Sequence, residues 1–157
     1  MIEVILSNEA RGTLKQFNED KGMHEMKIEA MNGSMLAFVG DAYYDLKVRE
    51  MLIKSGINKA NRFHKLTVFY VSANAQSMIL HQLIDEHFLT DDELEIVRRG
   101  RNVKSKSTPK NTDVIIYRQS TAFEALIGYL YLKGNTDRLD EVVARCIEIR
   151  KEDEPNG

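Results

Sequence analysis

Glu124 occupies a position in the sequence where an ionisable side chain is not expected. It is the only acidic residue of segment 120–132, which is otherwise apolar nearly all round a helix. A helix of that composition belongs in the centre of a fold, where a carboxylate is costly unless it is protonated, paired or bound to a metal ion. From the residues alone, a metal site competes with a structural bond to a lysine, an arginine or a backbone amide.

Asp41 is the second carboxylate that could do chemistry, and it lies in the sequence Val39-Gly-Asp-Ala-Tyr-Tyr-Asp-Leu46. A glycine inside a helix costs up to about 1 kcal/mol relative to alanine, so Gly40 indicates that another group approaches this surface closely. Asp41 and Asp45 share one helix face, and for Asp45 we expect a solvated ion pair with Arg49. A solvated face is also the alternative for Asp41. Two carboxylates from different helices would suit Mg²⁺, which prefers oxygen ligands and keeps several waters.

Positive charge is concentrated in one short stretch of the chain. The net charge is −2, which argues against a protein that coats nucleic acid with its whole surface, yet residues 98–110 hold six basic residues and no acidic one. A local basic cluster is what a polyanionic ligand would use, and the alternative is a solvated loop. The residues predicted to contact such a ligand are Arg98, Arg99, Arg101, Asn102, Lys104, Lys106 and Lys110.

The elements that must position these residues are all predicted to be helices. Apolar residues recur at helical spacing, no stretch alternates as a strand would, and the pattern indicates one bundle of about six or seven helices. Ser34 and Asn58 are predicted N-caps, and Thr90 with Glu93 forms a predicted capping box. The predicted helices cover residues 23–33, 34–55, 58–64, 66–87, 91–99, 113–133 and 136–150, with a basic loop at 101–112.

Each of the longer helices is predicted to bury one apolar stripe. The stripe of the 34–55 helix is Leu36, Val39, Tyr43, Leu46 and Ile53. The stripe of the 66–87 helix is Val68, Val71, Ala75, Met78, Ile79 and Leu83. The last helix is predicted to turn Leu139, Val142, Val143 and Ile147 inward, with Cys146 as a packing residue.

The composition limits the classes of protein that remain. The 157 residues fit one domain of ordinary size, and the single cysteine can form neither an internal disulfide nor a zinc cluster. No stretch approaches the ~20 apolar residues of a membrane span. The first residues lack the basic segment and apolar run of a secretory signal, so a cytoplasmic location is expected.

Several segments together resemble the Mini-ribonuclease III family. Residues 39–46 resemble the reduced signature of ribonuclease III domains. Arg-Arg-Gly-Arg-Asn-Val-Lys-Ser at 98–105 and Thr-Pro-Lys-Asn-Thr-Asp-Val at 108–114 resemble the family's basic loop region. Tyr-Arg-Gln-Ser-Thr-Ala-Phe-Glu-Ala-Leu-Ile-Gly-Tyr-Leu at 117–130 is similar to its second acidic motif, and Tyr-Val-Ser-Ala-Asn-Ala-Gln at 70–76 also fits. The resemblance covers about residues 30–150 and rests on the combination, since Gly-Asp-Ala alone is a weak signal.

The resemblance implies an all-α ribonuclease III endonuclease-domain helical bundle with no appended double-stranded-RNA-binding domain. It implies a homodimer that binds duplex RNA across a groove formed by both subunits and hydrolyses its phosphodiesters with Mg²⁺, leaving 5′-phosphate and 3′-hydroxyl ends. The expected role is maturing the ends of the 23S ribosomal RNA precursor, with a ribosomal protein left open as a further partner and no membrane partner. Asp41 matches the family's essential aspartate and Glu124 its metal-binding glutamate, so both are expected to be catalytic and to hold the metal.

The resemblance also divides the chain and leaves two other functions open. Residues 1–22 are an N-terminal extension of unclear structure, 23–150 a ribonuclease III-like catalytic domain and 151–157 a flexible tail. Full-length ribonuclease III enzymes carry further acids where this chain has Ser34, Ala37 and Thr121, a reduced set that Mini-ribonucleases III share. Water and RNA oxygens would then complete the metal shell. The alternatives are a catalytically weak RNA-binding protein of the same fold involved in ribosome assembly, and a helical interaction module whose acids only make ion pairs.

Overall fold

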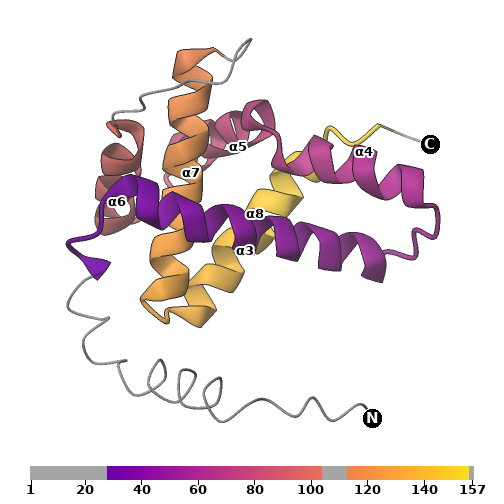
Figure 1. Ribbon diagram of the computed structural model, residues 1–157, viewed down its shortest axis with the longest axis horizontal. Helices are drawn as coiled ribbons and strands as arrows, with labels where there is room; N and C mark the ends of the chain where they lie inside the picture. The colour runs from indigo at the N-terminus through magenta and orange to yellow at the C-terminus, as the bar shows by residue number, and fades with distance from the viewer. Residues whose placement is uncertain (1–27, 104–112, 156–157) are drawn as a thin grey trace, which may run out of the picture. The chain divides into compact units, whose positions relative to one another are not determined.

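The structure is a computed structural model that describes residues 28–103 and 113–155. The chain separates into two units, Met1–Met31 and Asn32–Gly157, and the helices α3 to α8 belong to the second. They are α3 (Gly33–Lys54), α4 (Ala60–Val71), α5 (Ala73–Asp85), α6 (Asp91–Arg101), α7 (Val114–Leu132) and α8 (Thr136–Lys151) (Figure 1). The described residues contain no strand, so the predicted all-α fold is confirmed. The expectations for residues 1–22, most of the 23–33 helix and residues 104–112 lie outside the described residues, and the domain boundaries stay a prediction.

α7 is the central helix of the second unit. α3, α5, α6 and α8 all pack against it, and Figure 1 shows α3 crossing in front of it. Phe123, Leu126, Ile127 and Leu130 of α7 are at most 2% exposed, so the predicted burial of this apolar segment is confirmed. Because neighbours cover several of its sides, α7 needs no polar face, and Glu124 is left among apolar neighbours.

α3 begins one residue earlier than predicted, and its predicted apolar stripe was largely wrong. Asn32, not Ser34, is the N-cap, with its side-chain oxygen accepting from the amide of Met35 at 3.0 Å. Only Leu36 of the predicted stripe is buried, whereas Leu46 and Ile53 are 61% and 67% exposed. The side that packs on the fold consists of Gly33, Leu36, Ala37, Gly40, Tyr44, Val48 and Leu52. α3 therefore carries apolar residues on two opposite sides, and helical spacing alone cannot tell which side is buried.

The two helices after α3 were predicted with the wrong boundary. In place of helices at 58–64 and 66–87, α4 runs to Val71 and α5 begins at Ala73. Ser72 separates them in an extended conformation (φ −60°, ψ 156°), and its hydroxyl accepts from the amide of Ala75 at 3.2 Å. The serine is a good N-cap, but it sits in an unbroken apolar pattern that conceals the break. Lys59, not Asn58, is the N-cap of α4, and of the expected stripe Val68 is 48% exposed.

The remaining helix ends follow the expected local chemistry. The capping box of Thr90 and Glu93 is confirmed, and Asp113 accepts from the amides of Ile115 and Ile116 to cap α7. Glu93 also binds Arg138 of α8 at 2.7 Å in a largely buried ion pair, which joins α6 to α8. Leu139, Val142, Val143 and Cys146 of α8 are buried as predicted, while Ile147 is partly exposed. In the part of the chain that the structure describes, no helix has both the length and the hydropathy needed to cross a bilayer.

Candidate active site

The site is built where the backbones of α3 and α7 touch. A Cβ atom added to Gly40 would lie 1.7 Å from the carbonyl oxygen of Glu124. A Cβ added to Gly128 would lie 1.8 Å from the carbonyl oxygen of Leu36. No side chain larger than hydrogen fits at either position, so the predicted close approach at Gly40 is found. Because Asp41 follows Gly40 directly, this crossing brings Asp41 and Glu124 together.

The two carboxylates influence each other electrostatically. Burial, and then the charge of Asp41, raises the pKa of the Glu124 carboxyl to about 8. Burial, and then the charge of Asp45, raises the pKa of Asp41 as well. Among the described residues neither carboxylate has a hydrogen bond or an ion pair, so the structural alternative for Glu124 is not found there. The two carboxyl groups therefore interact closely, and the described residues place no cation beside them, which is an arrangement suited to a bound cation.

Asp45 behaves as the solvated residue that the sequence indicated. Its carboxylate accepts from Nε of Arg49 at 2.9 Å, and the two side chains are 34% and 63% exposed. Within the described residues no group of three or more His, Cys, Asp or Glu side chains could hold a metal ion together. Thr121, one turn before Glu124 on α7, donates to the carbonyl oxygen of Tyr117 at 3.1 Å. The described residues therefore offer two carboxylates, Asp41 and Glu124, at this site.

The basic end of α6 lies against the part of α7 that carries Glu124. A Cβ on Gly100 would be 2.8 Å from Cα of Ala122 and 2.9 Å from Cβ of Ala125, which are two residues before and one residue after Glu124. Of the predicted ligand-contacting residues, Arg101 and Asn102 are exposed, Arg99 is partly exposed, and Arg98 is paired with Glu95 at 2.6 Å. Lys104, Lys106 and Lys110 lie outside the described residues.

An exposed apolar face on α3, next to Asp41, was missed at the sequence level. Phe38 is 82% exposed and Leu46 61%, and a cavity of about 440 Å³ opens between this face and Tyr131. The lining residues are Phe38, Val39, Asp41, Ala42, Tyr43, Leu46 and Tyr131. The signal was available: α3 has apolar residues on both sides, whereas a surface helix of a monomer normally has one.

Comparison with known proteins identifies the family. The model of the Ribonuclease III domain matches residues 34–135, a range that holds both carboxylates and the basic end of α6. The chain belongs to the ribonuclease III family. Mini-ribonuclease 3 of Streptococcus pneumoniae is 44% identical over 121 residues, which cover 77% of this chain and 94% of that protein. Mini-ribonuclease 3 of Brevibacillus brevis is 50% identical over 118 residues, 75% of this chain and 87% of that protein.

A solved structure shows the same fold as this chain. The crystal structure of a Fusobacterium nucleatum protein superposes with a TM-score of 0.68 at 30% identity, covering 80% of this chain and 98% of the other. Together with the curated relatives, this match confirms the predicted resemblance to Mini-ribonuclease III and the predicted class of enzyme. The protein is an endoribonuclease of the ribonuclease III family.

Proposed function

We propose that the protein hydrolyses double-stranded RNA with Mg²⁺ held by Asp41 and Glu124. The observation that carries this proposal is the position of Glu124. Its carboxyl is largely buried at the α3–α7 crossing, its pKa is raised to about 8 by burial and by Asp41, and no described cation neutralises it. A divalent cation bound by both acids would offset the repulsion between the Asp41 and Glu124 carboxylates and the cost of burying the ionised Glu124.

The donor atoms fit magnesium better than a softer metal. Both groups are carboxylates, and no cysteine or histidine joins them in a described cluster of three or more candidate ligands. Mg²⁺ favours oxygen ligands and usually keeps several waters while binding one or two carboxylates and substrate phosphates. When bound, such an ion lowers the pKa of a coordinated water and stabilises charge on a phosphodiester.

The chain's own residues provide the remaining tasks of binding and orientation. Asp41 and Glu124 come from two helices whose backbones are in contact, and this contact sets the spacing of the backbone positions that carry them. The exposed side chains of Arg101 and Asn102 lie at the end of the helix that packs beside Glu124, where they would meet a phosphate backbone. A-form RNA is recognised mostly through phosphates and 2′-hydroxyls, which suits a basic surface without base-reading elements. The whole predicted contact set, Arg98, Arg99, Arg101, Asn102, Lys104, Lys106 and Lys110, belongs to this proposal.

The exposed face of α3 supports a homodimer as the working unit. Met35, Phe38 and Leu46 are all more than half exposed, and Phe38 and Leu46 line the cavity beside Tyr131. A second copy is the proposed occupant because a two-fold interface pairs the same patch on both subunits. The patch holds the protruding side chain of Phe38 beside a cavity of about 440 Å³, so Phe38 of each subunit could enter the cavity of the other. This interface would place two Asp41–Glu124 pairs on one dimer.

The proposal extends to a biological substrate through the likeness to Mini-ribonuclease 3. We propose maturation of the 23S ribosomal RNA precursor in the cytoplasm, with a ribosomal protein as a candidate helper. The test is cleavage of a precursor transcript whose two ends are base-paired, followed by mapping of the new ends, with and without ribosomal proteins bound. Cleavage at random positions of the paired stem under both conditions would contradict this role while leaving the nuclease activity intact.

The direct test is incubation of pure protein with long duplex RNA and Mg²⁺ over a range of salt. Wild type and the control Asp140→Asn, an exposed carboxylate on α8, should cleave, and Asp41→Asn and Glu124→Gln should not. Absence of cleavage by wild type would overturn the proposed reaction, and duplex binding without cleavage would indicate the RNA-binding alternative. Cleavage that survives Asp41→Asn would overturn the assignment of the site.

A further inference from the structure

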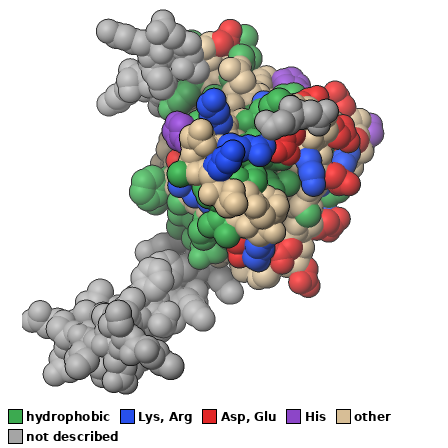
Figure 2. Space-filling model, turned by 90° about the vertical axis from the view of Figure 1, so that its right-hand side faces the viewer, with side chains coloured by type: hydrophobic (Ala, Val, Ile, Leu, Met, Phe, Trp, Pro, Cys, Tyr) green, Lys and Arg blue, Asp and Glu red, His purple; other side chains and the backbone are tan. Residues whose placement is uncertain are grey.

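A second basic surface lies at the connection between α3 and α4. Residues 51–84 contain no aspartate or glutamate, and their four Lys and Arg residues all fall between 54 and 65. Arg49 and Glu50 precede this stretch on α3, and Glu50 pairs with Lys54 at 3.3 Å. We call the exposed basic side chains of this region the α3–α4 corner; they are Arg49, Lys54, Lys59, Arg62, His64 and Lys65. Figure 2 looks onto the side of the molecule where α3 joins α4, and Lys and Arg side chains lie on this face with Asp and Glu side chains beside them and along the right-hand edge.

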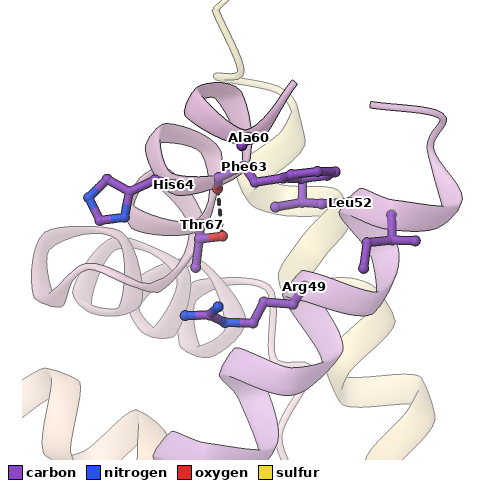
Figure 3. A pocket seen from close by; sticks show the side chains of 7 residues that line it. Arg49, Leu52, Ala60, Phe63, His64 and Thr67 are labelled. Atoms are coloured by element: carbon purple, nitrogen blue, oxygen red, sulfur yellow. Dashed lines mark hydrogen bonds between the residues drawn. The ribbon is translucent and has the colours of Figure 1, made fainter. Parts of the chain in front are cut away.

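Arg49 stands at the rim of a groove in this corner. The groove has a volume of about 390 Å³ and is lined by Arg49, Leu52 and Ile53 of α3 and by Ala60, Phe63, His64 and Thr67 of α4. Figure 3 shows Arg49 reaching from α3 toward Thr67, with His64 pointing to the same side and Phe63 turned toward Leu52. The Arg49 guanidinium and the His64 imidazole therefore lie on one rim, while apolar side chains form the wall behind them.

Much of the hydrogen-bonding capacity of Arg49 is unused within the described residues. Its Nε donates to Asp45 at 2.9 Å, and no described residue accepts from its two terminal amino groups. Its side chain is 63% exposed. A guanidinium held by one nitrogen and open at the other two is oriented for a bidentate contact with a phosphate.

The position of Arg49 along α3 relates it to the proposed metal site. A Cβ on Gly33, at the start of α3, would lie 2.8 Å from Cα of Gly100, so the basic end of α6 adjoins that end of the helix. Asp41 is eight residues from Gly33 and Arg49 eight residues further, about 12 Å in each direction at a rise of about 1.5 Å per residue. Asp41 is thus midway between two basic surfaces, and a polyanion lying over it along α3 would meet both.

We propose that Arg49 binds a backbone phosphate of the substrate strand, away from the bond that is cut, and that Asp45 positions its guanidinium. The α3–α4 corner then forms the second of two phosphate-binding surfaces that flank the Asp41–Glu124 pair. The inference rests on the proposed cleavage of duplex RNA and deepens it by adding a binding surface. Arg49 is a binding residue in this scheme, and Asp45 is a positioning residue that acts only through it.

The test compares binding and catalysis in three variants of the full chain. Arg49→Ala, Arg49→Lys and the control Lys151→Ala, an exposed cation at the end of α8, are titrated with a labelled RNA duplex in chelator at several salt concentrations. Arg49→Ala should bind roughly three- to tenfold more weakly at low salt. The steepness with which log affinity falls with log salt should decrease by about 1, because one phosphate contact is lost. Arg49→Lys should recover part of the affinity, since it keeps the charge without the fork of donors.

Kinetics separate a binding role from a structural one. With Mg²⁺ and duplex RNA, Arg49→Ala should raise KM and leave kcat nearly unchanged, because the lost contact is equally strong before and during reaction. Asp45→Asn leaves the Arg49 guanidinium in place, so the salt dependence of RNA affinity should match that of the wild type. Its KM should rise less than that of Arg49→Ala. If wild type binds and cleaves duplex RNA while Arg49→Ala matches Lys151→Ala in affinity and slope, this inference alone is overturned. If wild type neither binds nor cleaves it, the proposed function itself fails.

Discussion

Gly40 of α3 and Gly128 of α7 lie opposite each other, and the backbones of the two helices are in contact through them. A Cβ on Gly40 would come within 2.8 Å of the amide nitrogen of Gly128, and a Cβ on Gly128 within 3.0 Å of that of Gly40. The glycines sit directly before Asp41 and four residues after Glu124, so the closest contact between the helices is also what sets the two carboxylates side by side.

Gly40→Ala is expected to destabilise the protein and to weaken metal binding together. The added methyl group would overlap the carbonyl oxygen of Glu124, and α3 and α7 must separate to admit it. We expect a loss of roughly 3 kcal/mol in the free energy of unfolding, the upper range for overpacking. The control is Gly56→Ala, which meets no atom within 4 Å and should cost only about 1 kcal/mol for its positive φ of 84°. Denaturant unfolding of both variants measures the difference, and equal costs would contradict the role of the crossing.

Magnesium should raise the thermal stability of the wild type through the two carboxylates. A ligand that binds only the folded state stabilises it in proportion to the logarithm of its concentration, by about 2.7 kcal/mol at one hundred times the Kd. Asp41→Asn and Glu124→Gln should lose most of this increase in Tm, while Asp140→Asn should keep it. Thermal melts with and without Mg²⁺ give the result without any RNA, and an undiminished increase in either of the first two variants would exclude that residue as a ligand.

In chelator, the stability of the wild type should fall as the pH rises through the range set by Glu124. The pKa of its carboxyl is 4.5 in the unfolded reference and about 8 in the fold, because of burial and the charge of Asp41. The folded state therefore binds the extra proton between these values, and the free energy of unfolding decreases with rising pH across that window. Glu124→Gln lacks the ionisable group, so its stability relative to the wild type should increase through the same window.

The difference between the two proteins gives the size of this effect. Near pH 5 they should be similar, and above about pH 8 the variant should be more stable by roughly 2 kcal/mol, allowing about 1.4 kcal/mol for each pKa unit and screening of the partly accessible carboxyl. Urea titrations at several pH values measure it. A difference that does not change with pH would mean that Glu124 ionises at its ordinary pKa.

A charge on the exposed face of α3 should separate the proposed dimer. Phe38→Glu places a carboxylate where an apolar side chain that is 82% exposed would be covered by the second copy. We expect a monomer by light scattering and a loss of cleavage of at least about tenfold, since burying an unpaired charge costs several kcal/mol. Ile115→Glu, at a residue of α7 that is 65% exposed but not on this face, is the matched control and should remain a dimer. A monomeric wild type would contradict the interface directly.

Reversing charge at the end of α6 should weaken RNA binding without affecting the fold. Arg101→Glu replaces an exposed cation near the helix end that packs on Ala122 and Ala125. Binding of duplex RNA in chelator should weaken roughly tenfold at low salt, with a shallower salt dependence, because phosphate contacts release fewer counterions. The Tm should stay within a few degrees of the wild type. Unchanged affinity would count against a role for this end of α6.

Local chemistry in the sequence was sufficient for some of the helix ends, such as the start of α6, and for the residues that could do chemistry. Thr90 and Glu93 form their capping box because both partners lie within one turn, and α7 is recognisable because it is apolar nearly all round. Glu124 could be singled out for the same reason, since a lone acid on such a helix is costly wherever the helix packs. The break at Ser72 was missed because a serine cap inside an apolar pattern has no second local signal.

The tertiary structure decided which of the two apolar sides of α3 is buried, and therefore which residues lie next to Asp41. Both sides carry apolar residues, so the periodicity could not distinguish Leu52, which is 2% exposed, from Ile53, which is 67% exposed. Only packing against α7 through Gly40 selects the inner side, leaves Phe38 outside, and places Asp41 beside Glu124. The sequence determines the local free-energy cost of each residue, such as that of an acid on an apolar helix. The proximity of positions 41 and 124 depends on how α3 and α7 cross, and no local pattern encodes that crossing.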